Sequence, residues 1–591
     1  MKENKNYNHG TILSSSKYGN SFMYEQDQQL QKRRIKKLQW FFVLILVLGY
    51  FAAAMAQTIG ASETYTATSV FNPTIKDAVK LGDLPEIKDT VKKISTINYS
   101  IVSTPLVSKY EVTPIEAAKM QNEPLSKLYH SLLKVGMGTY TTPYGEFWVN
   151  SLRTRDVAYG IHFKHLSSSS HLKDVGYSGY SDNEGEIFGK KFYKKHTLTG
   201  EFNYKRNVTH FYGYDSTENH LDKDYTKQRY QLFEPVVKVQ SHYTDSTKIN
   251  HMIKAGYYNL TDLYHVAENN VKLNTLFNTF INKERLFVAF DADYYNHKLP
   301  NDTFNDVILR LNPYFETHGK KWMIDIGLAA TVDAFSNTST KFYFHPQLNA
   351  QFDVYEGIIV PYAGVNGGLQ KNSLRSLSNE NPFITSTINY RNSNTKINVF
   401  GGLKGNLSSK TSYDIKAAYS KVDSMHFFVV DYTVNGTLDN QYKVLYDNTD
   451  LFNVSGQVKY QYKEKIHFLA KGNYYMYKTK NLTRAYHKPD FDLTFSAQYN
   501  LKSKIIIKAD VFVIGNQFAL TQVSDANFNY TTEPKLLSGI VDVNLGAEYR
   551  YSKMLSFFVN FNNIANQRYY RWEKYPSQRF NLMAGLTFIP F

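Results

Sequence analysis

The sequence predicts an all-β fold, a transmembrane antiparallel β-barrel of about 22 strands, with 20 or 24 strands as the alternatives. A short N-terminal periplasmic or lumen-facing segment precedes it. Aromatic residues make up 15% of a chain whose mean hydropathy is only -0.44, which indicates strands with one face in an apolar phase and one in water. Many segments of about ten residues alternate apolar and polar side chains, and the connections between them alternate between short and long.

Residues 1–56 have the pattern of a leader and signal peptide. Five basic residues lie within Lys32–Lys37, the mostly apolar stretch Trp40–Ala53 follows, and Ala54-Met55-Ala56 forms an A-x-A cleavage site before Gln57. The alternative is an uncleaved membrane anchor, but the apolar stretch is short for a helical span. We therefore expect an exported mature chain that begins at Gln57.

The chain contains no cysteine, which excludes both disulfide bonds and a lipid anchor attached to a cysteine. Its formal charge is +16, and the predicted mature chain retains most of this excess. Basic proteins often bind nucleic acid, but an exported chain rarely meets it. We therefore expect no nucleic-acid partner, and favour attraction to acidic lipid head groups or to an anionic solute.

Residues 57–131 differ in composition from the rest of the chain. They contain a short internal echo, PTIKDAVK at Pro73–Lys80 and PEIKDTVK at Pro85–Lys92. Two copies are too few for a solenoid repeat. We interpret this region as an N-terminal periplasmic or lumen-facing segment, with a partly ordered linker as the alternative.

Residues 132–591 have the pattern of an outer-membrane β-barrel. In one segment Leu555 and Phe557 face one way while Ser556 faces the other. The segments are about ten residues long, the length that a tilted strand needs to cross a bilayer. The same alternation recurs over 397–404, 454–462, 505–513 and 540–550.

The connections predict which ends of the strands lie together. Tight polar turns alternate with long polar stretches, as in barrels with short periplasmic turns and long extracellular loops. The predicted short turns are 245–248, 282–284, 318–320, 463–465, 501–504 and 551–553. The predicted long loops are Ser168–Lys191, Asp215–Lys227, Asp439–Asp450, Gln517–Leu537 and Asn563–Gln578.

The last strand continues its alternation almost to the end of the chain, with Phe580 and Phe588 on one apolar face. An unpaired edge in lipid leaves backbone groups without partners, so this strand must pair with the first one, near Leu132. The parity changes before Phe591, which predicts a bulge at Pro590. Strand-like segments number about 24, but one long strand around Ser420–His426 is counted twice, and we prefer 22.

The final hairpin, FVNFNNIANQRYYRWEKYPSQRFNLMAGLTFIPF, resembles the end of TonB-dependent receptors. That family closes with a strand, an N-x-x-N turn, a Y-Y-x-W-x-x-Y-P type loop and a last strand that ends in an aromatic residue. The resemblance covers residues 132–591 and implies a large monomeric barrel in the outer membrane. The matching positions are Asn563, Asn566, Tyr569, Tyr570, Trp572, Tyr575, Pro576 and Phe591.

The front of the chain departs from that family. TonB-dependent receptors carry a plug domain and a short TonB-contacting box, whereas the segment 57–131 is short and lacks Gly/Arg-rich plug strands. We therefore expect a receptor-type barrel without a conventional plug, whose activity does not depend on TonB.

No residue pattern predicts a catalytic, cofactor-binding or metal site, and we expect no enzyme and no cofactor. His210 and His220, for example, lack metal-ligand spacing. The lumen is predicted to be polar and balanced in charge, because basic and acidic side chains both fall on the inward face. These residues are Lys459, Lys471, Lys508, Glu201, Asp510, Asp542 and Glu548.

The sequence leaves two functions open. The first is transport or reception of a solute across the outer membrane, and the second is a structural subunit of an outer-membrane secretion or assembly complex that transports nothing itself. The expected partners are outer-membrane lipid, the outer-membrane assembly machinery, which would engage the strand that ends at Phe591, and further membrane proteins.

Overall fold

The computed structural model describes residues 129–590 except 153, 337, 433–438, 464 and 525–529. The chain divides into two units, Met1–Thr113 and Pro114–Phe591, and every described residue belongs to the second. The predicted signal peptide and nearly all of the segment 57–131 therefore lie outside the described residues, so their interpretation stays a prediction.

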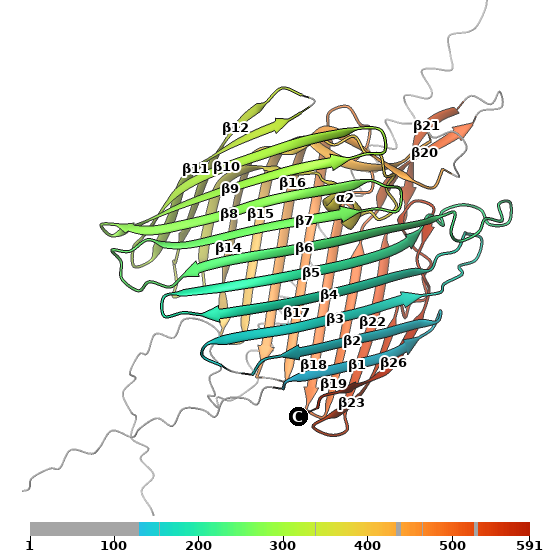
Figure 1. The fold of residues 1–591 in the computed structure, drawn as a ribbon, viewed down its shortest axis with the longest axis horizontal. Helices are drawn as coiled ribbons and strands as arrows, with labels where there is room; N and C mark the ends of the chain where they lie inside the picture. Colours follow the sequence, from blue (N-terminus) through green and yellow to red (C-terminus); the bar gives the residue numbers. More distant parts are fainter. Residues whose placement is uncertain are drawn as a thin grey trace, which may run out of the picture. The chain divides into compact units, whose positions relative to one another are not determined.

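The described chain forms one antiparallel sheet of 22 strands that closes on itself as a barrel (Figure 1). Two short hairpins, β20–β21 and β24–β25, lie outside this sheet. The elements are β1 (Ser131–Gly138), β2 (Thr142–Asn150), β3 (Val157–Ser168), β4 (Tyr180–Phe192), β5 (His196–His210), β6 (Lys227–Ser241), β7 (Asn250–Thr261), β8 (Ala267–Ile281), β9 (Glu284–Lys298), β10 (Thr303–His318), β11 (Trp322–Phe335), β12 (Lys341–Phe352), β13 (Val360–Gln370), α2 (Leu374–Glu380), β14 (Ser393–Ser408), β15 (Thr411–Val430), β16 (Tyr442–Tyr462), β17 (Ile466–Thr479), β18 (Phe491–Leu501), β19 (Ile505–Ile514), β20 (Gln517–Ser524), β21 (Tyr530–Leu537), β22 (Ile540–Arg550), β23 (Leu555–Asn562), β24 (Tyr570–Trp572), β25 (Tyr575–Pro576) and β26 (Asn581–Phe588).

The barrel closes between its first and last strands, as predicted. β1 pairs with β26 from Leu133 opposite Phe588 to Gly138 opposite Met583. The predicted bulge at Pro590 is wrong, because the ladder ends at Phe588 and the proline follows the strand. Phe591 lies outside the described residues.

β15 explains the double counting in the sequence. It is a single strand of 20 residues, and its pairing with β16 shifts register between Val422 and Met425. Ser424 has a positive φ of 54° at this point, which breaks the apolar alternation there. The strand number of 22 is therefore confirmed.

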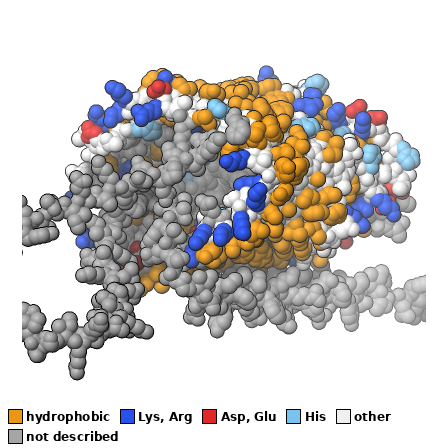
Figure 2. All heavy atoms as spheres, turned by 90° about the horizontal axis from the view of Figure 1, so that it is seen from below, with side chains coloured by type: hydrophobic (Ala, Val, Ile, Leu, Met, Phe, Trp, Pro, Cys, Tyr) orange, Lys and Arg blue, Asp and Glu red, His pale blue; other side chains and the backbone are white. Residues whose placement is uncertain are grey.

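The outer face of the barrel is an apolar belt. Outward side chains such as Phe163, Ile326 and Phe557 are 46–55% exposed, although large apolar side chains are normally buried in water-soluble domains. A space-filling view shows a broad hydrophobic area bordered by Lys and Arg side chains (Figure 2). This is the surface that a barrel presents to lipid.

No helix among the described residues is long and apolar enough to cross a membrane.

The two ends of the barrel differ in the length of their connections. The predicted short turns gather at one end, which we call the inner rim because short turns are periplasmic in such barrels. The long loops gather at the other end, the outer mouth. Two predicted loops are partly wrong: β4 begins at Tyr180 inside 168–191, and β16 begins at Tyr442 inside 439–450. Their inward polar side chains give these strands a loop-like composition.

Candidate functional site

The inner wall is polar, and its charges alternate across neighbouring strands. On β1 to β5 the paired positions are, in order, Lys134, Glu146, Lys164, Glu184 and Lys205. Glu184 lies 4.0 Å from Lys164 and 3.3 Å from Lys205. Opposite charges on facing strands stabilise the sheet and leave little net charge on this part of the wall.

Two of the inward acidic residues predicted from the sequence, Asp510 and Asp542, accept hydrogen bonds on the inner wall. The carboxylate of Asp510 accepts a hydrogen bond from Ser496 at 2.6 Å, and that of Asp542 accepts one from the Tyr569 hydroxyl at 2.8 Å. Lys459, Lys471, Lys508 and Glu548 lie on the same inward face of their strands, as Glu201 does on β5. Within the described residues, no group of three or more His, Asp or Glu side chains could hold a metal ion.

The connection between β13 and β14, residues 371–392, folds into the barrel mouth, and we call it the lid. It contains α2, which begins at Ser373. The Ser373 hydroxyl accepts from the Ser376 amide at 3.2 Å, and the Ser376 hydroxyl accepts from the Ser373 amide at 2.8 Å. This reciprocal pair is a capping box, which fixes where the short helix begins.

Apolar side chains of the lid form a core with the inner wall. Leu374, Leu377 and Ile384 are fully or almost fully buried, with exposed fractions of 0–1%. Burial of such a side chain stabilises the packed state by about 1.5–3 kcal/mol. The wall residues in the same cluster are Tyr230, Leu232, Tyr258, Leu260, Tyr295, Phe304 and Ile308.

Ionic contacts fix the helical half of the lid to the wall. The two terminal nitrogens of Arg375 donate to the two oxygens of Glu234 at 3.0 and 2.9 Å. Lys272 Nζ donates to the same carboxylate at 2.6 Å. Buried Glu268 accepts from the amide of Leu374 at 2.6 Å. Because buried charges are tolerated only when paired, these contacts define one position of the lid.

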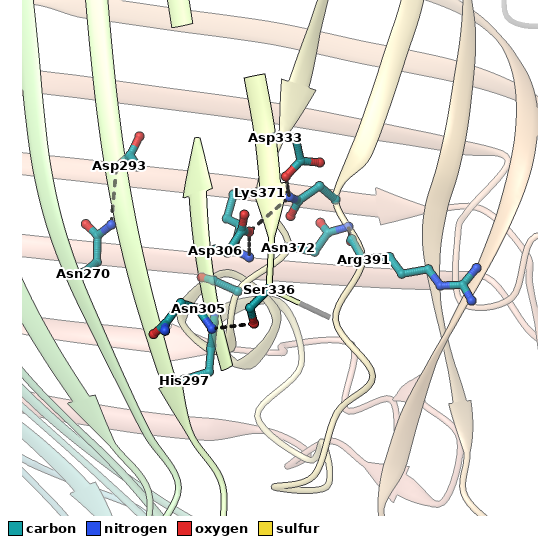
Figure 3. A network of polar contacts seen from close by, with 12 residues as sticks. Asn270, Asp293, His297, Asn305, Asp306, Asp333, Ser336, Lys371, Asn372 and Arg391 are labelled. Atoms are coloured by element: carbon teal, nitrogen blue, oxygen red, sulfur yellow. Dashed lines mark hydrogen bonds and ion pairs between the residues drawn. The ribbon is translucent and has the colours of Figure 1, made fainter. Parts of the chain in front are cut away.

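Further ionic contacts lie at the start of the lid and at the end of α2. At its start Lys371 pairs with the fully buried Asp306, and Figure 3 shows the two side chains pointing toward each other with Asp333 beside them. At the end of α2, Glu380 pairs with His426 and Lys488, both at 2.7 Å. Burial alone would raise the pKa of Glu380, but the hydrogen bond from His426 and the charge of Lys488 lower it to about 2.

Neighbouring loops pack over the lid. The ring of Tyr575, in the loop between β23 and β26, stacks on Phe383 of the lid at a centroid distance of 3.7 Å. The hydroxyl of Tyr442 donates to the carbonyl of Glu573 at 2.7 Å. Trp572 completes this contact by packing edge-on against Phe428. The lid is therefore held on one side by the wall and on the other by loops.

His487 joins two of these loops. Its Nδ1–H donates to the carbonyl of Phe428 at 2.9 Å, and its Nε2 accepts from the amide of Glu573 at 3.3 Å. This arrangement requires a neutral ring, because a protonated Nε2 cannot accept. Burial lowers the pKa of His487 to about 4.

A cavity of about 470 Å³ remains between the lid and the strands β4 to β7, and we call it the side cavity. Its volume falls in the range of small-molecule sites. It reaches from Leu172, Ser178 and Gln578 in the outer loops to side chains of the inner wall. The remaining lining residues are Tyr180, Asp182, Lys205, Asn207, Val208, Thr209, Tyr212, Tyr230, Leu232, Leu260, Arg375, Ser378, Asn379, Pro382 and Phe383.

The side cavity has little free positive charge. Its two basic residues already face carboxylates, since Lys205 pairs with Glu184 and Arg375 pairs with Glu234. Most other polar groups are hydroxyls and amides, and Tyr180, Tyr212 and Tyr230 supply aromatic surface. Such a lining suits an uncharged solute with many hydrogen-bonding groups better than a small anion.

The aromatic loop motif found in the sequence packs against the lid. Trp572 and Tyr575 are 7% and 3% exposed and lie in the core around the lid. Asn563 and Asn566 have positive φ values of 48° and 53° and shape the turn before them. The lid itself was missed, although Ser373 before Leu374 and Leu377 is a recognisable signal for the start of a helix.

No model of a known protein family matches the sequence. No curated protein matches it in sequence either. Solved structures match it in fold, with a TM-score of 0.61 and 9% identity for the FrpB iron transporter from Neisseria meningitidis, over 78% of this chain and 82% of that one.

Two receptors from Pseudomonas aeruginosa match similarly. The pyoverdine outer membrane receptor FpvA has a TM-score of 0.58 and 12% identity over 79% of each chain. The ferric enterobactin receptor PfeA has a TM-score of 0.56 and 11% identity over 78% of this chain and 80% of that one. All three are TonB-dependent receptors. With its apolar belt and its 22 closed strands, this chain is an outer-membrane β-barrel with the fold of the TonB-dependent receptors.

Proposed function

We propose that this protein transports or receives a solute across the outer membrane, with the side cavity as its first binding site and the lid as a releasable obstruction. The observation that carries the proposal is the lid itself. It is built from a loop of the barrel, occupies the mouth, and is fixed largely by side-chain contacts that can separate without unfolding a barrel strand.

The lining of the side cavity favours an uncharged solute rich in hydroxyl groups. Because both cations in the cavity are paired with carboxylates, a free anion would have to displace a protein carboxylate. An uncharged, hydroxyl-rich solute would instead bond to groups such as Asn207, Thr209 and Asn379 and stack on tyrosine. A solute of the size of a short oligosaccharide fits a volume of this order.

The structural-subunit alternative also has an observation in its favour. The lid is packed on both sides and carries several ion pairs, as a permanently filled barrel would. The two functions differ in whether the lid moves while the barrel stays intact.

A disulfide across the lid tests this difference, since the natural chain has no cysteine to interfere. Ile384 in the lid and Tyr442 on β16 form a parallel bridge, and backbone bonds of 2.8 and 2.9 Å flank it. In planar bilayers the variant I384C/Y442C should show openings when reduced and none when oxidised. The same protein in its two redox states, and I384C alone, are the controls.

The proposal also requires a conducting pathway behind the lid. Replacing residues 374–388 with a Gly-Ser linker should give a continuously open barrel that lets raffinose into liposomes faster than citrate. A barrel that stays closed after this replacement would contradict transport and favour the structural subunit. Equal entry of citrate would contradict the solute class alone.

A further inference from the structure

The inner rim carries a ring of exposed basic side chains, which we call the basic collar. Ten short turns make up this rim, and nine of them contain Lys or Arg. Thirteen basic residues stand against four described acidic residues, Asp156, Asp245, Asp353 and Glu356. The collar consists of Arg155, Lys194, Lys195, Lys248, Lys283, Lys320, Lys321, Lys410, Lys463, Lys465, Lys502, Lys504 and Lys553.

The collar is available to a ligand. All thirteen side chains are exposed, and no ion pair joins any of them to a described carboxylate. Exposed like charges placed around one ring repel each other, so an anionic partner that surrounds the ring would relieve this repulsion.

The outer mouth has no comparable excess of positive charge. Its described loop residues contain thirteen basic and thirteen acidic side chains, and many of them pair, such as Lys535 with Glu573 and Arg568 with Asp174. The excess of positive charge in the described loops and turns therefore lies at the inner rim.

Apolar side chains place the collar at the edge of the lipid belt. Tyr193, Trp322 and Tyr551 are 40–62% exposed. Tyr193 and Tyr551 lie in collar turns, and Trp322 begins β11 directly after one. Aromatic side chains with this placement mark the boundary between hydrocarbon and head groups. Lysine side chains beside them can extend along the belt and place their ammonium groups among the head groups.

We propose that the basic collar binds the phosphate head groups of anionic phospholipids in the inner leaflet of the outer membrane. The distribution of the charges favours lipid over a protein partner, because the cations surround the whole barrel. A ring of lipid contacts all nine turns at once, whereas one acidic protein would contact an arc of them. The ligand class is a phosphodiester held by several ammonium groups through charge-assisted contacts.

Two variants that each lose four positive charges test whether lipid binding depends on the position of the basic residues or only on the net charge of the protein. The collar variant replaces Lys194, Lys320, Lys502 and Lys553 with Gln. The control variant replaces four exposed residues of the outer mouth with Gln, namely Lys173, Lys223, Lys480 and Arg579, none of which forms an ion pair with a described carboxylate. All eight positions lie in turns or loops, outside the strands that form the barrel.

The experiment incorporates each full-length protein into vesicles of equal parts phosphatidylglycerol and phosphatidylcholine, extracts it in mild detergent, and measures the two lipids that remain bound. The wild type should retain phosphatidylglycerol preferentially, and the preference should fall with salt. The collar variant should lose about fivefold or more of this preference, while the control variant should stay within about twofold of the wild type.

Further arms distinguish the other sources of negative charge. Inorganic phosphate should reduce the lipid preference no more than chloride at equal ionic strength, and a stronger effect would mean that free phosphate is the ligand. Equal loss of the preference in both variants would overturn the proposal, because net charge alone would then explain it. Unchanged lipid in the collar variant, together with loss of an acidic protein purified from native membranes, would overturn it in favour of a protein dock.

Discussion

The outer mouth and the inner rim of this barrel use the same chain in opposite ways. At the mouth, long loops fold inward, bury Leu374, Tyr442 and Tyr575, and form several ion pairs. At the rim, turns of two to eight residues bury no comparable core, and their basic side chains stay exposed. A loop that is long enough to form its own core can close a pore, while a short turn can only present its side chains to the surroundings.

The two proposals made above assign different tasks to the two ends. The mouth has the cavity, the lid and the loops that hold them, so changes there should alter what passes through the barrel. The rim has charge beside an aromatic belt, so changes there should alter how the barrel sits among lipids. The following predictions test each part of the comparison.

The largest effect is expected from truncating β26, because the whole barrel depends on this strand for its closure. Deleting Leu586–Phe591 removes pairs with β1 and β23, among them Leu133 with Phe588, and leaves backbone groups unpaired at bilayer depth. Folded protein should disappear from the outer membrane, as measured by heat-modifiable mobility on gels. Accumulation of a heat-modifiable truncated protein at normal levels would refute the closure seen here.

A cavity inside the lid core should open the mouth while the barrel stays folded. The double variant L374A/L377A removes two almost fully buried side chains, each at a cost of about 2–5 kcal/mol. We expect frequent channel openings in planar bilayers with unchanged heat modifiability. Leu328→Ala, on the outward face at 49% exposure, is the control and should leave conductance unaltered.

Breaking one partner of the lid's ion pair should have a smaller effect. Arg375→Met leaves Glu234 with only Lys272 beside it, and an incompletely compensated buried charge costs about 3 kcal/mol. Openings should become more frequent than in the wild type but less frequent than in the double leucine variant. Adding Glu234→Gln should recover part of the closure, and a purely additive loss would show that the two residues act independently.

Acid should loosen the mouth before the rim. The pKa of His487 is about 4 in the folded protein and 6.5 ordinarily, so the unfolded loops bind more protons as the pH falls from about 6.5 to 4. Above this pH range the neutral ring of His487 contributes fully to the stability of the folded loops, and at pH 5 this contribution is smaller by about 2 kcal/mol. Hydrogen exchange of 480–490 should accelerate at pH 5 after correction for intrinsic rates. His318→Gln, at the rim, should leave that acceleration intact, whereas unchanged exchange in the wild type would contradict it.

The smallest effect is expected from Phe591→Ala. This change removes one side chain at the end of the chain, where we predict that the assembly machinery engages the last strand. The amount of inserted barrel should fall moderately, while conductance per molecule stays the same. A changed conductance with normal yield would assign the residue to function instead of assembly.

Much of the barrel could be predicted from sequence because lipid imposes a simple rule on each strand. Phe557 and Leu586 must face outward and their neighbours inward, so alternation alone identified the strands, the short turns and the closing pair. Errors occurred at Tyr180 and Tyr442, where β4 and β16 begin inside predicted loops because their inward polar side chains give them a loop-like composition.

The lid could not be predicted because its partners are far away in sequence. Arg375 meets Glu234, which is 141 residues earlier, and Leu374 bonds to Glu268, which is 106 residues earlier. Read alone, the lid sequence is short, polar and interrupted by Pro382, like an ordinary surface loop. The local signal at Ser373 could indicate where a short helix begins, but only the closed barrel brings the two carboxylates to one place, so the site itself could not be read from it.

The lid is joined to the wall at both ends, to β13 before it and to β14 after it. A detached lid segment therefore stays within the length of a 22-residue tether from its seat, at an effective local concentration of about millimolar or more. Under the proposed function, reclosure would be an intramolecular event whose rate does not depend on the amount of protein. A barrel that opens in this way closes again without help after each opening, so solutes can leak through it only while the lid segment is detached.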